Sequence, residues 1–419
     1  MEKLVERGSG LDVHRDTVSA CVRIPGSGGA KKQEIVQTFG TMTEELLALR
    51  DWLKAHGVTH VAMESTGVFW KPVYHVLEND FTVLLVNASH IKNVPGRKTD
   101  VKDCAWIAEL LEHGLLRGSF VPPEPIRDLR DLTRHRKALM QERSRGVQRL
   151  HKLLQDAGIK LSSVATNIMG VSGRAMIDAM LEASEHPTAS QDATALADLA
   201  KGRLRAKLPA LRKALEGRFR KHHGFMVGEI LSHVDYLDEA LERLTKEIDE
   251  VIRPFEEEVT RLTTIPGVER KTAAVIVAEI GVDMKQFPTA QHLASWAGLC
   301  PGNNESAGKH RSGKTRKGDR WLRTALVEAG LAAMRSRKTY LSAHDQRIAR
   351  RRGHRKAIVA VAHSILVMSY HMMSRKASYH ELGRDFFEQK DQEAIKRRCI
   401  RQLERLGLNV VVTEKEAAA

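Results

Sequence analysis

The chain has 419 residues, of which 42% are hydrophobic, enough for two or three folded domains and too many for a disordered chain. It carries 67 Lys and Arg against 52 Asp and Glu, a formal net charge of +15, which favours a polyanionic partner such as nucleic acid over a merely basic protein. Four scattered cysteines without a C-x-x-C pair exclude a zinc site or a disulfide framework. We find no apolar signal region and no run of about 18–20 apolar residues, and so expect a soluble intracellular protein without a membrane span.

The first part of the chain alternates strands and helices, which is typical of an α/β domain. Apolar alternation predicts a strand over residues 9–24, a Pro-Gly-rich turn and a second strand near residues 34–39, together forming a hairpin. The elements expected next are a helix over residues 41–54 opened by a capping box at 41–44, a strand over 59–64, a helix over 69–78, a strand over 82–86 and a helix from about Asp100 to Glu112.

Four carboxylates lie on these elements. Asp12 is inside the first strand, Glu64 ends a later strand, and Asp100 and Asp103 are three residues apart at the start of a helix. Residues i and i+3 share one helix face, so both aspartates can face the strands that carry the other two. The four charges would repel one another, and Mg²⁺ or Mn²⁺, which prefers oxygen ligands, would relieve that repulsion. We predict a divalent-metal site; singly, each residue could instead be a helix-capping or strand-end surface charge, and His14 beside Asp12 is secondary.

Residues 124–258 lose the strand alternation and are expected to be a helical or coiled-coil region that links domains and forms oligomers. The segment 225–258 has apolar residues at helical or heptad spacing, which predicts a long helix or an antiparallel coiled coil. The segments 128–155 and 201–223 are basic and helical, suited to a nucleic-acid backbone, the alternative being a solvated helix face. The predicted contacts on the first of them are Arg134, Arg136, Lys137 and Arg143.

A third region, residues 259–376, opens with two helical segments around the turn Ile265-Pro266-Gly267-Val268. This pattern indicates a helix-hairpin-helix motif whose turn, at Gly267, offers backbone N–H groups to a phosphate. An ordinary αα-hairpin is the alternative. The remaining residues, 377–419, are expected to form a helical tail.

A Gly-rich basic loop occupies residues 296–323 of the third region. Small residues let a backbone approach a phosphate closely, and the loop's cations would neutralise it. Ser306 is a candidate nucleophile that would need activation by a base or a metal. From the residues alone a loop serine is more often a turn residue, and Ser312 stays open as a second candidate. The cations predicted to contact nucleic acid are Lys309, Arg311, Lys314, Arg316, Lys317, Arg320 and Arg323.

Together these motifs resemble the DEDD transposases of insertion sequence family one-ten, including the related eleven-eleven group. The resemblance spans roughly residues 8–375 and is carried by segments 10–14, 64–67, 98–103, 265–268, 298–301 and 317–323. It implies an RNase H-like (RuvC-like) α/β catalytic domain over residues 8–123, a helical or coiled-coil middle over 124–258, and a mostly α C-terminal transposase domain with a helix-hairpin-helix-like motif and a serine loop over 259–376.

The resemblance also implies catalytic roles. Asp12, Glu64, Asp100 and Asp103 match the family's metal ligands, and the family serine maps to Ser306, although the usual Ser-Ser-Gly reads Ser-Ala-Gly here. The expected activity is excision and insertion of an insertion sequence through a covalent phosphoserine link, assisted by Mg²⁺. The expected partners are double-stranded DNA, a structured guide RNA from the element and further copies of the chain, as a dimer or tetramer, in a prokaryotic cytoplasm at the nucleoid.

Two other function classes stay open at this point. One is a metal-dependent RuvC-like endonuclease that resolves junctions without a covalent intermediate, its C-terminal half serving only to bind DNA. The other is an inactive nucleic-acid-binding protein, against which the intact acidic quartet argues.

Overall fold

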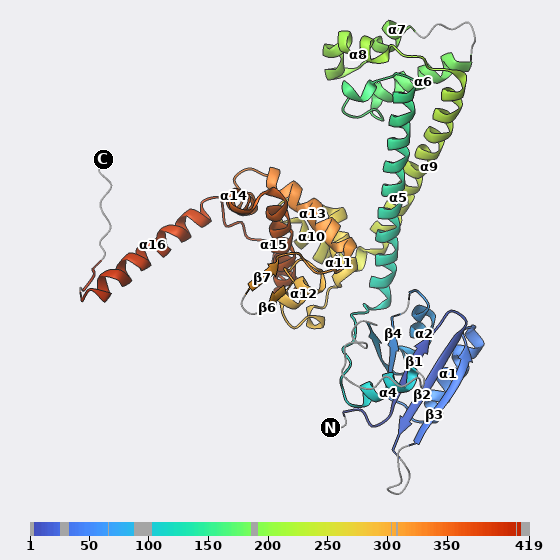
Figure 1. Cartoon of the computed structure of the whole chain (residues 1–419), viewed down its shortest axis with the longest axis vertical. Coiled ribbons are helices and arrows are strands. Elements are labelled where there is room, and N and C mark those ends of the chain that lie inside the picture. The colour runs from blue at the N-terminus through green and yellow to red at the C-terminus, as the bar shows by residue number, and fades with distance from the viewer. Residues whose placement is uncertain are drawn as a thin grey trace. The chain divides into compact units, whose positions relative to one another are not determined.

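The computed structural model divides into two compact units, Met1–Val121 and Pro122–Ala419 (Figure 1). The first is a mixed α/β sheet domain and the second is mostly helical, so this coarse fold prediction is confirmed. The residues that the structure describes are 4–25, 33–65, 67–87, 103–185, 192–302, 304–306, 309–407 and 409–411.

The first unit is built on a five-stranded sheet with the strand order β3-β2-β1-β4-β5. The first three strands along the chain pair antiparallel, whereas β4 pairs parallel with both β1 and β5. Parallel neighbours need crossover connections, and helices α1 (Thr43–Ala55) and α2 (Trp70–Leu77) supply them. The strands are β1 (Gly8–Val13), β2 (Thr17–Ile24), β3 (Gln33–Gly40), β4 (His60–Glu64) and β5 (Thr82–Val86).

Two local predictions in this unit are wrong. Residues 9–24 form two antiparallel strands, because the polar run 14–16 reverses the chain and the His14 N–H bonds to the Thr17 carbonyl at 2.9 Å. The predicted capping box does not form at Thr41: the N-cap is Met42, whose N–H donates to Glu45 at 3.4 Å, while the Thr41 hydroxyl donates to the Arg15 carbonyl. Turns this short leave the apolar pattern on either side unbroken, so periodicity alone does not locate them.

Helices cover both faces of the sheet. Alternate strand residues such as Leu11 and Met63 pack against α1 and α2 on one face. Helix α4 (Asp103–Glu112) covers the other face, where Ala62 meets Ile107. A Cβ at position 10 would lie 2.2 Å from the Cys104 carbonyl oxygen, so only glycine lets α4 approach β1 this closely.

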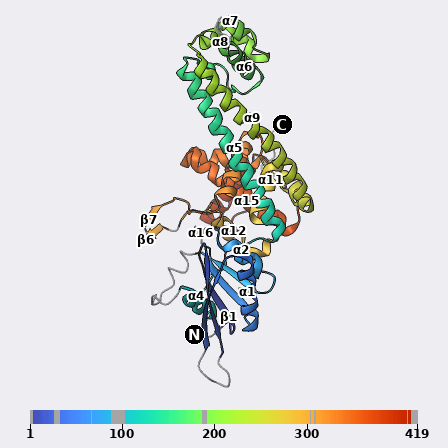
Figure 2. The ribbon, with the colours of Figure 1, turned by 90° about the vertical axis from the view of Figure 1, so that its right-hand side faces the viewer.

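The second unit begins with two long helices, α5 (Glu124–Asp156) and α9 (Lys221–Val251), which pack side by side (Figure 2). Contacts of Arg136 with Thr245 and Arg143 with Asp238 show that the two run antiparallel. The chain between them folds into a small helical cluster at one end of the pair. Its elements are η2 (Leu161–Ser163), α6 (Val171–Glu185), α7 (Ala193–Asp198), η3 (Gly202–Lys207) and α8 (Leu208–Leu215).

The basic segment 201–223 is mostly helical, as predicted, but it is not one helix. It divides into η3, α8 and the start of α9, and residues 216–220 between the last two are not helical. Across this break the Arg218 N–H bonds to the Ala157 carbonyl oxygen at 2.7 Å, and Gly217 permits this close approach because a Cβ there would lie 2.6 Å from that oxygen. The segment 225–258 is likewise interrupted after Val251, where η4 (Arg253–Phe255) contains Pro254.

The rest of the second unit is a helical assembly around α15 (His354–Arg375), which packs against α12, α13 and α14. A two-stranded hairpin, β6–β7, interrupts the helices, and α16 follows along the tail. The elements are α10 (Glu256–Thr263), α11 (Arg270–Ile280), η5 (Met284–Gln286), α12 (Ala290–Trp296), β6 (Asn304–Ser306), β7 (Lys309–Ser312), α13 (Arg320–Arg335), α14 (Tyr340–Arg352) and α16 (Phe386–Arg405).

Helix α15 corrects the statement that no segment is apolar enough to span a membrane. Among the described residues, this one helix reaches the necessary length and hydropathy. However, 44% of its apolar window is buried inside the unit, including Val361 and Ile365. A core helix passes the same test, so no membrane is indicated. The expectation failed because the polar His and Ser residues along the helix interrupt the apolar run without lowering the mean hydropathy of the helix enough.

Candidate active site and nucleic-acid interface

Two predicted metal ligands, Asp12 and Glu64, lie on neighbouring parallel strands. The register of β1 and β4 pairs Leu11 with Met63, so the next residue along each strand is one of the two carboxylates. Side chains alternate between faces, which puts Asp12 on the face of Gly10 and Glu64 on the face of Ala62. Both therefore belong to the face that α4 covers.

Helix α4 runs antiparallel to β1 over this face and brings a third carboxylate to it. A Cβ at Gly8 would meet Leu111, while a Cβ at Gly10 would meet Ala108 and Cys104. The first residue of the helix, Asp103, accordingly lies toward the end of β1 that carries Asp12. The fourth predicted ligand, Asp100, lies outside the described residues.

Solvent reaches this end of the face. The Asp12 side chain is 23% exposed and lies 3.1 Å from Nε2 of His14, whose side chain is 63% exposed. Glu64 is half-buried and Asp103 is exposed. Carboxylate oxygens are the donors that Mg²⁺ prefers, so the chemistry of this set fits a hard divalent ion.

Elsewhere among the described residues, Asp156, His222 and His223 place three potential ligand atoms within 4.8 Å of one another. Nδ1 of the buried His223 accepts the Arg220 N–H at 3.1 Å, so its proton is on Nε2, which faces Asp156 Oδ2 at 3.3 Å. A metal at Nε2 would need the opposite tautomer. The geometry therefore favours a clamp between the end of α5 and the start of α9.

The serine loop has a fixed base and a strand hairpin. Gly298, with φ +69°, lies against Gly318, where a Cβ would be 2.3 Å from the Gly298 nitrogen. The Gly302 N–H bonds to the Lys314 carbonyl at 2.9 Å, and Pro301 bridges Thr315. Glycines at both closing positions thus let the two sides of the loop meet.

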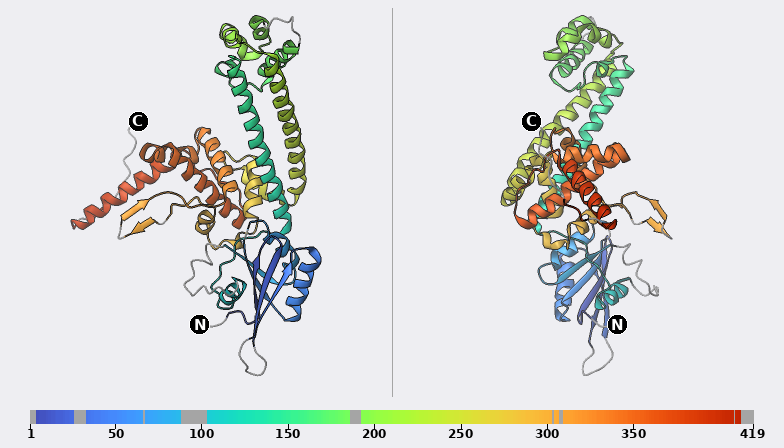
Figure 3. Two further views of the ribbon diagram at one scale, coloured as in Figure 1. Left: turned by 45° about the vertical axis from the view of Figure 1, so that its right-hand side comes forward. Right: turned by 90° about the vertical axis from the view of Figure 1, so that its left-hand side faces the viewer.

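Beyond that base, strands β6 and β7 extend from the helices of the unit (Figure 3). Ser306 pairs with Lys309 near the tip, and Ser312 pairs with Asn304 farther back. The side chains of Ser306, Arg311 and Ser312, and residues 307–308 altogether, lie outside what the structure describes. The backbone therefore separates the two candidate nucleophiles by position, with Ser306 at the tip.

The cations predicted around this loop mostly face solvent. Arg320 stacks over the Trp321 ring with its guanidinium carbon 4.5 Å from the centroid. Arg323 instead donates to the Gly298 carbonyl at 3.2 Å and holds the loop base. The exposed members are Lys309, Lys314, Arg316, Lys317 and Arg320.

The four cations predicted on α5 are engaged inside the second unit. Arg134 donates to both carboxylate oxygens of Glu279 at 2.7 Å and to Asp319 at 3.1 Å. Lys137 pairs with Glu328 at 2.6 Å, and Arg143 pairs with Asp238. Arg136 differs, because within the described part of the chain it makes no ion pair and donates from Nε to the Thr245 hydroxyl at 3.0 Å.

Glu279 and Asp319 are partners of Arg134 that the sequence reasoning missed. Glu279 is fully buried, and burial raises its pKa to about 6 against the opposing effect of Arg134 and Arg130. Asp319 caps α13 through the N–H groups of Trp321 and Leu322, both at 2.8 Å. No local signal could identify the pairing, since these partners are 145 and 185 residues away from Arg134 in sequence.

The turn of the predicted helix-hairpin-helix motif packs inside the unit. Gly267 has φ +86°, and a Cβ there would lie 2.5 Å from the Ala329 carbonyl oxygen on α13. The flanking Ile265 and Val268 are buried. This turn makes a helix–helix contact, and the motif is not confirmed.

Comparison with known proteins places the chain in a family. A model named for the DEDD transposases of IS110, described as a transposase, matches residues 9–159, and the model "Transposase IS116/IS110/IS902 family" matches residues 259–346. The chain belongs to the IS110 family of transposases. The first match contains Asp12, Glu64, Asp100 and Asp103, and the second contains Ser306.

Individual relatives are similar to this chain over limited lengths. The chain is 34% identical to the insertion element IS110 uncharacterized 43.6 kDa protein of Streptomyces coelicolor over 29% of either chain. It is 29% identical to a putative transposase of Sinorhizobium fredii over 38% of this chain and 40% of that one. It is 25% identical to the transposase for insertion sequence element IS1328 of Yersinia enterocolitica over 65% of this chain and 70% of that one. The chain thus spans less than half the length of the first two relatives.

Proposed function

We propose that this chain is a DNA transposase that excises and inserts an insertion sequence, using a metal-binding acidic quartet and a serine nucleophile. The observation that carries the proposal is the placement of Asp12, Glu64 and Asp103 toward one end of one sheet face by β1, β4 and α4. Asp100 would complete the set. The strand order supports an RNase H-like, RuvC-like domain, because it puts β1, which carries Asp12, at the centre of the sheet.

The acidic residues would hold Mg²⁺ or Mn²⁺. When bound, the ion would stabilise negative charge on the phosphate oxygens at the reacting phosphodiester. Asp12 is held by its contact with His14, so its carboxylate is restrained at the end of β1. Glu64 and Asp103 approach from an adjacent strand and a helix, and three elements of secondary structure fix the donors more firmly than a flexible loop would.

Ser306 would attack the DNA. Its hydroxyl oxygen forms a bond to the scissile phosphorus while the bond from that phosphorus to one deoxyribose oxygen breaks. The serine proton passes to a base, and the departing oxygen gains a proton, leaving a phosphoserine link and a free DNA end. The position of Ser306 at the tip of β6 favours it over Ser312, which is farther from the tip.

The partners would be DNA and RNA. The exposed cations around the hairpin suit a phosphate backbone and carry no base specificity of their own. The DNA sequence would then be recognised by a structured RNA encoded by the element, which would pair with donor and target DNA. The antiparallel helices α5 and α9 offer a surface on which copies of the chain form a dimer or tetramer.

The test is a search for a covalent protein–DNA adduct on a denaturing gel. Purified protein is incubated with Mg²⁺, co-expressed RNA and DNA that contains the element junction. We expect an adduct that is lost in Ser306→Ala, kept in Ser312→Ala and lost in Asp12→Ala, with duplex binding and folding unchanged in all three.

Other outcomes lead to other functions. Metal-dependent cleavage without an adduct in any variant would replace the proposal with a RuvC-like junction-resolving endonuclease. An adduct lost only in Ser312→Ala would identify Ser312, and not Ser306, as the nucleophile. Neither cleavage nor adduct in the wild-type protein, with DNA binding retained, would leave a nucleic-acid-binding protein.

A further inference from the structure

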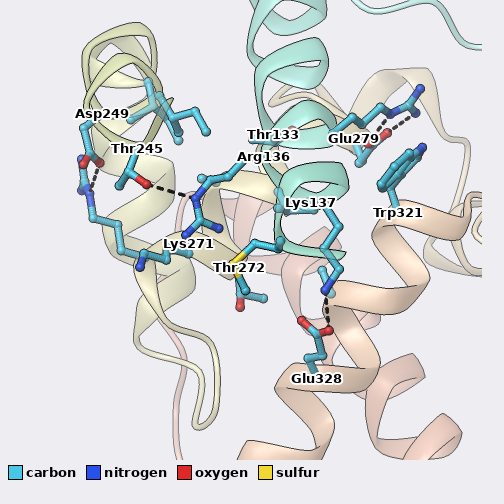
Figure 4. Close-up of a pocket in the computed structure, with 18 residues that line it drawn as sticks. Thr133, Arg136, Lys137, Thr245, Asp249, Lys271, Thr272, Glu279, Trp321 and Glu328 are labelled. Carbon is cyan, nitrogen blue, oxygen red and sulfur yellow. Dashed lines mark hydrogen bonds and ion pairs between the residues drawn. The ribbon is translucent and has the colours of Figure 1, made fainter. Parts of the chain in front are cut away.

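A pocket of about 390 Å³ lies inside the second unit, where α5, α9, α11 and α13 meet (Figure 4). This is within the usual range for a small-ligand site, and much too small for a duplex. Its wall combines apolar side chains, among them Ile248, Val275 and Trp321, with charged ones. None of the residues proposed above for catalysis lines it.

The charges in the pocket do not balance. Three acidic side chains line it, and each is paired: Asp249 with Arg270, Glu279 with Arg134, and Glu328 with Lys137. Five cations line it. The two that remain without a carboxylate contact, among the described residues, are Arg136 and Lys271.

Of these two cations, Arg136 is the one whose hydrogen-bond donors most clearly lack an acceptor. Its guanidinium is half-buried, and Nε donates a hydrogen bond to the Thr245 hydroxyl. The two terminal nitrogens have no protein acceptor among the described residues. Burial lowers its pKa, with Asp249 opposing. Figure 4 shows Arg136 turned toward Thr245 on one side of the pocket, with Trp321 beside Glu279 on the other. The two terminal nitrogens of a guanidinium are suited to bind a phosphate through paired N–H groups.

We propose that this pocket binds one unstacked nucleotide. The phosphate would lie against Arg136 and Lys271, and the base would enter the apolar part bounded by Ile248, Val275 and Trp321. Extracting a base from a stack costs free energy, so the pocket would select a nucleotide that is already unpaired, at a bulge, a loop or a strand end. The source of the nucleotide, a nucleic-acid strand rather than a free mononucleotide, rests on the proposed function.

The experiment measures binding of the full-length protein to two DNA probes by fluorescence. One duplex carries a single unpaired 2-aminopurine and the other is fully paired. We expect the wild-type protein to bind the bulged duplex more tightly and to change its 2-aminopurine emission. Arg136→Gln and Lys271→Gln should each weaken binding of the bulged duplex about tenfold and binding of the paired duplex less than about twofold, since each removes one charge-assisted contact.

Matched controls separate the pocket from general electrostatic attraction. Arg145→Gln on α5 and Lys246→Gln on α9 remove the same charge from exposed positions outside the pocket. They should leave the preference for the bulged duplex intact. An excess of AMP that abolishes the emission change would show that the pocket accepts free mononucleotides, whereas an unchanged signal would assign it to strand nucleotides.

The pocket inference fails if all proteins bind both duplexes alike, or if the control variants lose the preference as strongly as the pocket variants do. Folding of each variant is checked by its circular dichroism and thermal unfolding. Either failure leaves the proposed function standing where the serine adduct still forms. Conversely, a preference for the bulged duplex without any adduct would support the pocket and reject the recombinase.

Discussion

The basic residues of α5 and those around the β6–β7 hairpin look alike in sequence, yet the fold uses them differently. On α5, Arg134, Lys137 and Arg143 are paired with carboxylates of the same unit. Around the hairpin, Arg316 and Lys317 are exposed and contact no carboxylate among the described residues. The first group holds helices together, whereas Arg316 and Lys317 face solvent and can meet a phosphate. A charge count predicts a polyanionic partner but does not say which cations meet it.

Among the carboxylates that pair with α5, Glu279 should contribute most to the stability of the fold. Glu279→Ala should lower the free energy of unfolding by about 3 kcal/mol, because it removes the buried carboxylate that Arg134 and Arg130 share and leaves only the Asp319 contact of Arg134. Urea denaturation measures this. Glu328→Ala is the matched control: its pair with Lys137 is 58% exposed on the acidic side, so it should cost no more than about 1 kcal/mol. Equal losses would mean that the buried network contributes no more than a surface pair.

Glu279 should also give stability a specific dependence on pH. Burial raises its pKa from 4.5 to about 6, so the folded state binds its proton more tightly than the unfolded state does. The associated stability, about 2 kcal/mol, is fully present below pH 4.5 and lost as the pH rises through about 6. Other carboxylates titrate in this range, so the measured quantity is the difference between wild type and Glu279→Gln. A difference that stays constant from pH 4 to pH 7.5 would contradict the assignment.

The sheet, and the face on which Asp12 and Glu64 lie, could be predicted because their signals are local. Strand alternation puts Asp12 and Ala62 on one face and Leu11 on the other, and the parallel crossover follows from the intervening helix. The turn at residues 14–16 was not predicted, because the apolar pattern continues on both sides of it. The division of segment 201–223 depends on Gly217 meeting Ala157, a contact between residues 60 positions apart that composition does not encode.

The pairing of the α5 cations could not be predicted for the same reason. Arg134 and Glu279 belong to different helices, and their separation in sequence hides a bidentate contact that only the packed unit creates. At Gly267, by contrast, the local sequence signal predicted the structure but did not reveal what the turn does. Its turn residues correctly indicate two helices and a tight reversal, but the packing of α13 against it shows a structural use that the motif leaves open.

The smallest expected effects concern DNA binding. They test directly whether the cations around the hairpin contact DNA while those of α5 do not. Replacing Arg316 and Lys317 together with Gln should weaken duplex binding several-fold and reduce the slope of log affinity against log salt by up to about 1.8, because up to two phosphate contacts are lost. Stability should not change, since both side chains are exposed. Filter binding across a salt series measures the slope.

The matched variant replaces Lys137 and Arg143 with Gln. Its slope should stay within about 0.3 of wild type, because protein carboxylates already neutralise these cations and few counterions are released when DNA binds. Its free energy of unfolding should instead fall by about 1 kcal/mol, the usual contribution of exposed pairs. Equal changes of slope in the two variants would mean that the α5 cations leave their carboxylates for phosphate on binding, and the distinction between a structural and a nucleic-acid-facing cluster would then apply only to the free protein.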